Sequence, residues 1–132
     1  MGMGDSGRNV EAVGEAVRCL TDRDRMSMAQ SKVTISTVGP SPEVFMKLAD
    51  LPGTLAWSLH AADDSIRRKL VPSTRHSTVE LRDGLIKALE TRKSLRSRTI
   101  MIALTLIEGV NDSLEDAMKL AGILYYLTLY IN

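Results

Sequence analysis

Polar and small residues follow three short apolar runs of this sequence, at the points where the runs stop. The clusters are Ser36 to Gly39, Ser58 to Ala61 and Gly109 to Asp112, and a fourth, Met1 to Asp5, stands at the start of the chain. In folds built on parallel strands, ligands bind at the carboxyl ends of the strands. The clusters therefore predict one shared ligand site built from several strands.

The second cluster places two chemically useful side chains on one strand. Ser58 and His60 are two residues apart, so both side chains point the same way. No carboxylate stands at an obvious spacing to complete a Ser-His-Asp triad, and such residues are also common as caps or as hydrogen-bonded core groups. Asn111 with Asp112 is likewise typical of a loop or a helix N-cap. The residues alone leave the functional and the structural interpretations open.

The glycines near the start match the letters of the dinucleotide-binding pattern G-x-G-x-x-G, at Gly2, Gly4 and Gly7. That pattern needs a strand before it and an acidic residue about 20 positions later, at the end of the next strand. Neither is present, because Asp22 and Asp24 fall in an expected loop. The sequence disfavours a nicotinamide or flavin site.

Cysteine content limits the chemistry of the chain. Cys19 is the only cysteine among 132 residues, so an internal disulfide is impossible, and a cysteine-ligated metal or cluster would need ligands from elsewhere. The net charge of +1 does not indicate a nucleic-acid or membrane partner. No apolar run reaches the roughly 20 residues of a membrane span, and no secretory signal begins the chain. We expect a globular protein that is not secreted.

Apolar spacing predicts the elements that position the clusters. We expect strands over 32–37, 54–59 and 98–107. We expect helices over 9–20, from Ser41 onward, over 63–71 and over 77–91, the last opened by a capping box of Ser77 and Glu80. Repeated strand-helix units favour an α/β fold with a parallel sheet.

The C-terminal region predicts one more helix, capped by Asp112 or Ser113. Its inner face would comprise Leu114, Ala117, Met118, Ala121 and Leu124. The aromatic and β-branched tail from Tyr125 to Asn132 is expected to begin a further strand.

Two basic stretches, Arg67 to Lys69 and Arg92 to Arg98, are candidates for phosphate contact. Such runs are more often solvated helix faces.

Taken in order, the clusters resemble one family, the radical-SAM RNA methyltransferases of the RlmN type, which methylate C2 of adenine in ribosomal and transfer RNA. The resemblance covers about residues 1 to 124 without a break. The matching pieces are Met1 to Gly4 with Asn9, Val33 to Gly39, Leu51 to Gly53, Ala56 to Ala61, Ile66-Arg67, Leu70 to Pro72, and Gly109 to Asp112.

The resemblance implies a partial (β/α) TIM-like barrel, the radical-SAM core, with S-adenosyl-L-methionine lying across the strand ends. The family's cofactor-binding positions fall on Gly4, Asp5, Ser36, Ser58, Leu59, His60 and Asn111. The family's Gly-Glu-Pro motif reads Gly4-Asp5-Ser6 here, so the carboxylate is one methylene shorter and the proline is replaced.

The family also uses a [4Fe-4S] cluster held by three cysteines in a C-x3-C-x2-C pattern, and a further cysteine near the C-terminus that carries the methyl group. Cys19 matches none of these, so no catalytic or metal residue is assigned. We expect one partial radical-SAM core domain over residues 1–132, truncated at both ends and inactive by itself.

The resemblance further implies an RNA partner, ribosomal RNA with transfer RNA as a second target, no membrane, and a cytoplasmic or organellar (chloroplast or mitochondrial) location. Truncation would leave a sheet edge and the tail residues Tyr125, Tyr126, Leu127, Tyr130 and Ile131 poorly covered, which predicts low stability or self-association. Two alternatives are a catalytically dead SAM-binding or interaction module and an unrelated α/β binding domain.

Overall fold

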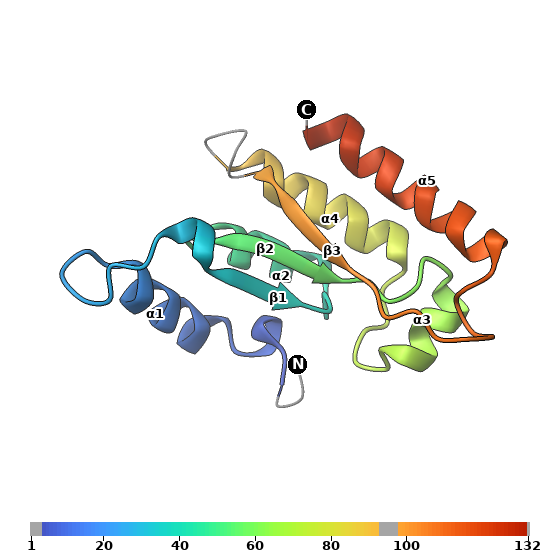
Figure 1. Cartoon of the computed structure of the whole chain (residues 1–132), viewed down its shortest axis with the longest axis horizontal. Coiled ribbons are helices and arrows are strands. Elements are labelled where there is room, and N and C mark those ends of the chain that lie inside the picture. Colours follow the sequence, from blue (N-terminus) through green and yellow to red (C-terminus); the bar gives the residue numbers. More distant parts are fainter. Residues whose placement is uncertain (1–3, 93–97, 132) are drawn as a thin grey trace.

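A three-stranded parallel sheet, with helices in the connections between its strands, organises the chain (Figure 1). The computed structural model describes residues 4–92 and 98–131. β1 (Thr34–Thr37), β2 (Thr54–Ser58) and β3 (Ile100–Ala103) lie in the order β1-β2-β3, and Trp57 is paired with Thr37 on one side and with Ile102 on the other. The predicted α/β class and parallel sheet are confirmed.

The helices that precede β3 lie where the apolar spacing predicts them. In the capping box before the fourth helix, Ser77 Oγ accepts from the Glu80 N–H at 3.2 Å, and the Glu80 carboxylate accepts from the Ser77 N–H at 2.8 Å. The elements are the 3₁₀ turns η1 (Ser6–Arg8) and η2 (Gln30–Lys32), and the helices α1 (Val10–Thr21), α2 (Pro42–Ala49), α3 (Asp64–Leu70), α4 (Thr78–Glu90) and α5 (Leu114–Ile131).

One face of the sheet forms the core with the helices. Alternate residues of a strand share a face, and this face is apolar, as in Ile35 of β1 and Leu55 of β2. Trp57 meets the ring of Phe45 from α2 edge-on, with 5.8 Å between ring centroids. The helices contribute Leu48, Leu81, Leu85, Leu89, Ile123 and Leu127 to the same cluster.

The other face carries small or polar side chains. Ser36, Ala56 and Ser58 lie on it, and Met101 of β3 is 48% exposed there. Figure 1 looks onto this face, with α2 and α4 behind the sheet. Ala56 and Ser58 are 2% and 3% exposed and Ser36 is partly buried, so this face is polar at the strand ends, and its accessible part lies around Ser36 and Met101.

The third strand is shorter than predicted. β3 ends at Ala103 rather than Ile107, because the side chain of Asn111 draws the following residues into a loop. Its Oδ1 accepts from the Ile107 N–H at 2.7 Å, and its Nδ2 donates to the Thr105 carbonyl at 2.9 Å. These bonds replace the ladder bonds that a longer strand would make.

The C-terminal predictions are partly wrong. The tail does not begin a strand, because α5 continues through Ile131. The helix is also rotated relative to the predicted face: Leu114 and Met118 are 79% and 68% exposed, and only Leu124 of the predicted set packs against the core. The residues that pack are Leu120, Ile123, Leu124 and Leu127. Their spacing of three and four residues stabilises a helix over the β propensity of the tail.

The apolar residues near the C-terminus differ in coverage. Tyr125 and Tyr126 are 63% and 48% exposed, as predicted, but Leu127 is buried. The side chains of Tyr130 and Ile131 lie outside what the structure describes. Over the described ranges, no helix combines the length and the apolarity that crossing a bilayer requires.

Candidate functional site

Two serine hydroxyls lie side by side at the carboxyl edge of the sheet, on its polar face, where Ser36 is partly buried and Ser58 is 3% exposed. Ser36 pairs with Ala56 across the β1–β2 ladder, so it lies diagonally opposite Ser58 on the same face. The two Oγ atoms are 3.3 Å apart and share a hydrogen bond. This pair joins two of the predicted clusters and offers hydroxyl donors and acceptors to a ligand.

His60 follows the second serine in a strained backbone. Its φ of 64° is in the left-handed region, uncommon for a residue other than glycine and typical of functional sites. The Nδ1 atom is buried and has no hydrogen-bond partner within the described part of the chain. Burial, and after it the charge of Arg67, lowers the pKa of His60, so the imidazole is neutral at pH 7. A neutral ring with one unused nitrogen can donate or accept one hydrogen bond to a ligand.

Asn111 closes the loop after β3 against the end of β2. Besides its bonds to Thr105 and Ile107, its Nδ2 donates to the His60 carbonyl at 2.7 Å. The side chain is 6% exposed. The amide is thus committed to backbone groups, and it positions His60.

Asp5 is held at the end of β1 by three donors of the chain itself. Its Oδ1 accepts from the Gly7 N–H at 2.8 Å and from Thr37 Oγ1 at 2.7 Å, and its Oδ2 accepts from the Val38 N–H at 2.8 Å. Gly4, before it, has open space where a side chain would begin. The carboxylate fastens the N-terminal segment to the strand end.

The side chain of Leu59 does not face the site. It is fully buried in the core, while its N–H donates to the Ala103 carbonyl at 3.0 Å. Only the backbone of Leu59 lies at the strand edge.

Arg67 is a site-shaping residue that the sequence reading missed. Instead of contacting solvent, it is 2% exposed beneath the strand ends. Its guanidinium donates to the carbonyls of Val38, after β1, and Leu59, after β2, and lies 5.9 Å from the centroid of Trp57. Burial lowers the pKa of Arg67 to about 10, which leaves it charged at pH 7. Its position on one face of α3 with Ile66 and Leu70 is the signal that could have identified it.

Arg92, from the second basic stretch, is also buried. Its Nε donates to the Ala49 carbonyl at 3.1 Å and its Nη1 to the Gly53 carbonyl at 3.0 Å. Residues 93–97 of that stretch lie outside the described residues. Phosphate contact is therefore wrong for both Arg67 and Arg92.

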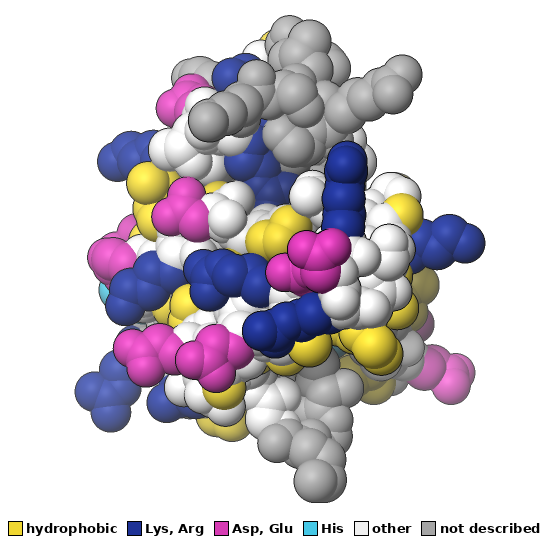
Figure 2. Space-filling model, turned by 90° about the vertical axis from the view of Figure 1, so that its left-hand side faces the viewer, with side chains coloured by type: hydrophobic (Ala, Val, Ile, Leu, Met, Phe, Trp, Pro, Cys, Tyr) yellow, Lys and Arg dark blue, Asp and Glu magenta, His cyan; other side chains and the backbone are white. Residues whose placement is uncertain are grey.

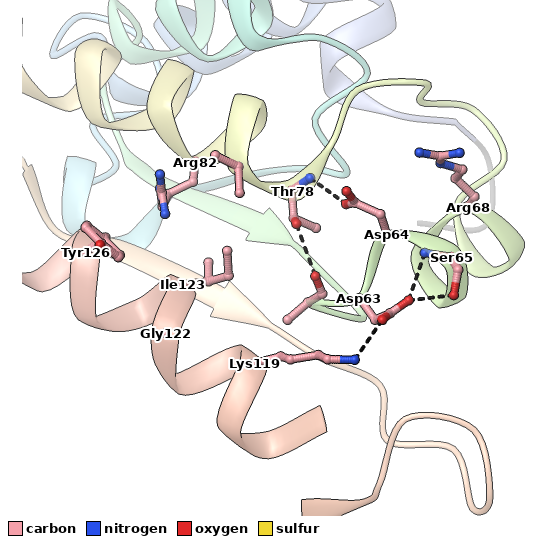
Figure 3. A pocket seen from close by; sticks show the side chains of 12 residues that line it. Asp63, Asp64, Ser65, Arg68, Thr78, Arg82, Lys119, Gly122, Ile123 and Tyr126 are labelled. Atoms are coloured by element: carbon pink, nitrogen blue, oxygen red, sulfur yellow. Dashed lines mark hydrogen bonds and ion pairs between the residues drawn. The ribbon is translucent and has the colours of Figure 1, made fainter. Parts of the chain in front are cut away.

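A cavity of about 640 Å³ lies apart from these residues, between α3, α4 and α5 (Figure 3). Lys119 of α5 reaches across it to Asp63, with 2.9 Å between Nζ and Oδ2, and Asp64 accepts from the Thr78 N–H at 2.7 Å. Hydrogen bonds from Ser65 and then Lys119 hold the pKa of Asp63 far below its usual range. The carboxylates here serve helix capping and helix packing.

The described residues do not form a metal site. Over 4–92 and 98–131, no three His, Cys, Asp or Glu side chains are grouped so that they could hold a metal ion. Cys19, in α1, is partly buried and distant in sequence from every cluster.

Comparisons with known proteins agree on one group of enzymes. No family model matches the chain. The chain is 40% identical, over its whole length, to the dual-specificity RNA methyltransferase RlmN of Sorangium cellulosum, and 39% identical over 91% of its length to a probable RlmN of Chlorobaculum tepidum. A crystal structure of a radical SAM methyltransferase from Sphaerobacter thermophilus matches 92% of the chain and 35% of that protein, at 32% identity and a TM-score of 0.80. The chain spans 34% and 32% of the two curated relatives, about a third of their length.

Proposed function

Because the chain belongs to the RlmN-type family of radical-SAM RNA methyltransferases, we propose that it supplies the S-adenosylmethionine shelf of an enzyme that methylates C2 of adenine in ribosomal RNA. Transfer RNA is the second target class in this proposal, and the compartment is the cytoplasm or an organelle. In this reaction the bound cofactor supplies both the radical and the methyl group. The residues of this chain bind and orient it.

The hydroxyl pair supports the proposal most directly. The Oγ atoms of Ser36 and Ser58 lie 3.3 Å apart on the polar face, at the edge where parallel folds bind ligands, with Ser36 the more accessible of the two serines. The buried Nδ1 of His60 is next to them in sequence and has no partner in the described chain. A cofactor with amino, carboxylate and ribose hydroxyl groups can pair with these atoms. The residues present therefore fit S-adenosylmethionine at this edge.

Two of the predicted ligand residues fit an indirect role better. Asp5 would have to exchange one of its three internal hydrogen bonds to reach a cofactor, and the amide of Asn111 is used by three backbone groups. We propose that Asp5 holds the end of β1 and Asn111 the end of β2, so that the serines and His60 keep their places.

The iron-sulfur cluster does not fit the residues of this chain. A [4Fe-4S] cluster of this family needs three cysteine thiolates, and the sequence has Cys19 alone. We propose that these ligands, and the methyl-carrying cysteine, come from polypeptide outside residues 1–132. On this proposal the chain is a partial radical-SAM core domain, inactive without that polypeptide.

The alternative, a SAM-binding or interaction module without catalysis, is favoured by one observation. In Gly4-Asp5-Ser6 the shorter carboxylate is turned inward onto Thr37 and Val38. Such a module would keep the shelf and lose the contact that the family's Gly-Glu-Pro motif makes.

Calorimetric titration of S-adenosylmethionine into the full chain tests the shelf. We expect weak binding that falls about tenfold in a Ser36→Ala, Ser58→Ala double variant, since two lost hydrogen bonds at about 0.7 kcal/mol each total about 1.4 kcal/mol. Ser31→Ala, on the exposed turn η2, is the control and leaves the affinity unchanged. Equal affinities in all three proteins, or no binding by the wild type, would refute the proposal that these serines bind the cofactor.

A second measurement separates the two candidate functions. The chain is mixed with polypeptide that carries both the three-cysteine motif and the methyl-carrying cysteine, and the mixture is loaded with iron and sulfide. RNA methylation is then measured with S-adenosylmethionine and a chemical reductant present. Methylation supports the enzyme; cofactor binding without methylation supports the module.

A further inference from the structure

Three cationic side chains, in the last turn of α3 and in the loop before α4, have no partner in the described chain. Arg68, Lys69 and Arg75 are exposed, and none of them makes a hydrogen bond or an ion pair over residues 4–92 and 98–131. Their neighbour Arg67 is buried beneath the strand ends, where its side chain is hydrogen-bonded to backbone carbonyls. The basic stretch of the sequence is therefore divided into one buried structural arginine and an unneutralised exposed group, here called the α3 cationic patch (Arg68, Lys69 and Arg75).

The patch lies at the same edge of the molecule as the proposed cofactor shelf. α3 follows the carboxyl end of β2, and the strand arrows in Figure 1 point toward it. Arg8 of η1 donates to the Ser73 carbonyl at 3.0 Å, and Thr74 Oγ1 donates to the Pro40 carbonyl at 3.3 Å. These bonds fix the loop between α3 and α4 against the segment after β1. Arg8 adds a further positive charge to this border.

The acidic groups at the border of the patch are already engaged. Asp63 and Asp64, which line the same cavity as Arg68, are held by Lys119 and by the Thr78 N–H. The Glu80 carboxylate accepts from Ser77 in the capping box, and hydrogen bonding to Ser41, and then to its own backbone, lowers the pKa of Glu43. At the amino ends of the strands the charges are arranged differently. Figure 2 views that end, where Lys and Arg side chains lie among Asp and Glu side chains.

The geometry of the patch suits an extended polyanion better than a small one. The three exposed cations are distributed over residues 68–75, in the last turn of α3 and the loop that follows it. Among the side chains that the structure describes, no aromatic residue belongs to the patch, since Phe45 and Trp57 are buried and Tyr125 and Tyr126 lie on α5. Contacts of this kind position a nucleic acid through its phosphates without reading its sequence.

We propose that the α3 cationic patch binds the phosphate backbone of single-stranded RNA and holds the target strand beside the cofactor shelf. This inference rests on the proposed function for its choice of RNA. It adds the surface of the chain that would contact that RNA.

Fluorescence anisotropy with a fluorescein-labelled, mixed-sequence 20-nucleotide RNA tests the proposal on the full chain. The test variant is Arg68→Gln, Lys69→Gln, Arg75→Gln. The control is Arg23→Gln, Lys32→Gln, Lys87→Gln, which removes the same charge from exposed positions elsewhere. Thermal unfolding of both variants confirms that they are folded.

The salt dependence identifies phosphate contacts. Each phosphate neutralised on a single strand adds about 0.7 to the slope of log K against log salt concentration, so three contacts add about 2. We expect the test variant to lose about this slope and to bind about tenfold to a hundredfold more weakly at 0.1 M salt, while the control loses less than threefold. Equal losses of RNA affinity in the two variants, or no RNA binding by the wild type, would refute the proposal that the patch binds RNA. S-adenosylmethionine titrated into the same proteins shows separately whether the shelf is retained, so failure of the patch is distinguishable from failure of the proposed function.

Discussion

Two glycines with the same backbone angle make a matched pair for measuring how tightly the end of β1 is packed. Gly39 and Gly109 both have φ of 70°, where a side chain costs about 1–2 kcal/mol. A Cβ added at Gly39 would lie 2.7 Å from Phe45 Cζ and 3.3 Å from Trp57 Nε1, whereas at Gly109 it would meet nothing within 4 Å. The two substitutions to alanine therefore differ in packing and not in backbone strain.

The expected magnitudes follow from these contacts. For Gly109→Ala, the strain is partly offset by the reduced entropy of the unfolded chain, leaving a loss of about 1 kcal/mol. Gly39→Ala adds overpacking of about 1–3 kcal/mol, because the Phe45 ring is fully buried and Trp57 Nε1 donates to the Val38 carbonyl. We expect a total loss of about 3 kcal/mol, and at about 4 °C per kcal/mol a fall in Tm of about 12 °C against about 4 °C for Gly109→Ala.

Urea unfolding of both variants, followed by Trp57 fluorescence, measures the difference. A Phe45→Leu background should reduce the cost of Gly39→Ala, since a shorter side chain leaves room for the new methyl group. If Gly39→Ala and Gly109→Ala cost the same, the packing argument is refuted and the strand end is looser than the structure indicates.

Three further outcomes are expected. Arg67→Met should lower the free energy of unfolding by about 2 kcal/mol, because the loss of two hydrogen bonds from a charged donor outweighs the gain from removing a buried charge. Arg68→Met should change it by no more than about 0.5 kcal/mol. Equal effects of the two substitutions would contradict the buried role of Arg67. Because burial lowers the pKa of His60 in the folded state, the unfolded chain takes up the proton first, so the wild type should lose stability as the pH falls below 6.5. His60→Asn, which tolerates positive φ, should show a flatter pH dependence, and parallel curves would argue against this role of His60. The exposed apolar residues of α5 should make the isolated chain self-associate, as measured by sedimentation velocity. The double variant Leu114→Lys, Met118→Lys should be a monomer, whereas Met46→Lys on α2 should still self-associate. A monomeric wild type would refute this prediction.

Local signals explain what the sequence predicts well. The capping box of Ser77 and Glu80 involves residues three apart, and Pro42 at the start of α2 restricts its own φ, so both helix starts are visible without tertiary structure. The shared face of Ser36 and Ser58 follows from the two-residue period of strands once the strands are parallel and in register. The shelf is predictable for the same reason.

Contacts between distant segments explain what the sequence does not predict. Arg67 bonds to a carbonyl 29 residues away, and Asp5 to a backbone N–H 33 residues away, so no spacing within a motif shows that these charges are buried or engaged. The predicted buried face of α5 is wrong for a different reason. Both faces of this helix carry apolar residues, so the spacing of apolar residues does not show which face is buried. Tertiary contacts, among them the ion pair of Lys119 with Asp63, set the rotation of the helix.

The order of the strands also has a consequence for how the chain folds. Thr34 of β1 and Thr54 of β2 are 20 residues apart, whereas Leu55 of β2 and Ile100 of β3 are 45 apart. Closing the longer loop costs about 0.7 kcal/mol more chain entropy. Arg67 then reinforces the early pair, because it bonds to the segments after β1 and β2 and to nothing on β3 within the described chain. The β1–β2 half should therefore acquire amide protection before β3 docks in pulse-labelled refolding, which makes the serine pair of the shelf an early product of folding rather than its last step.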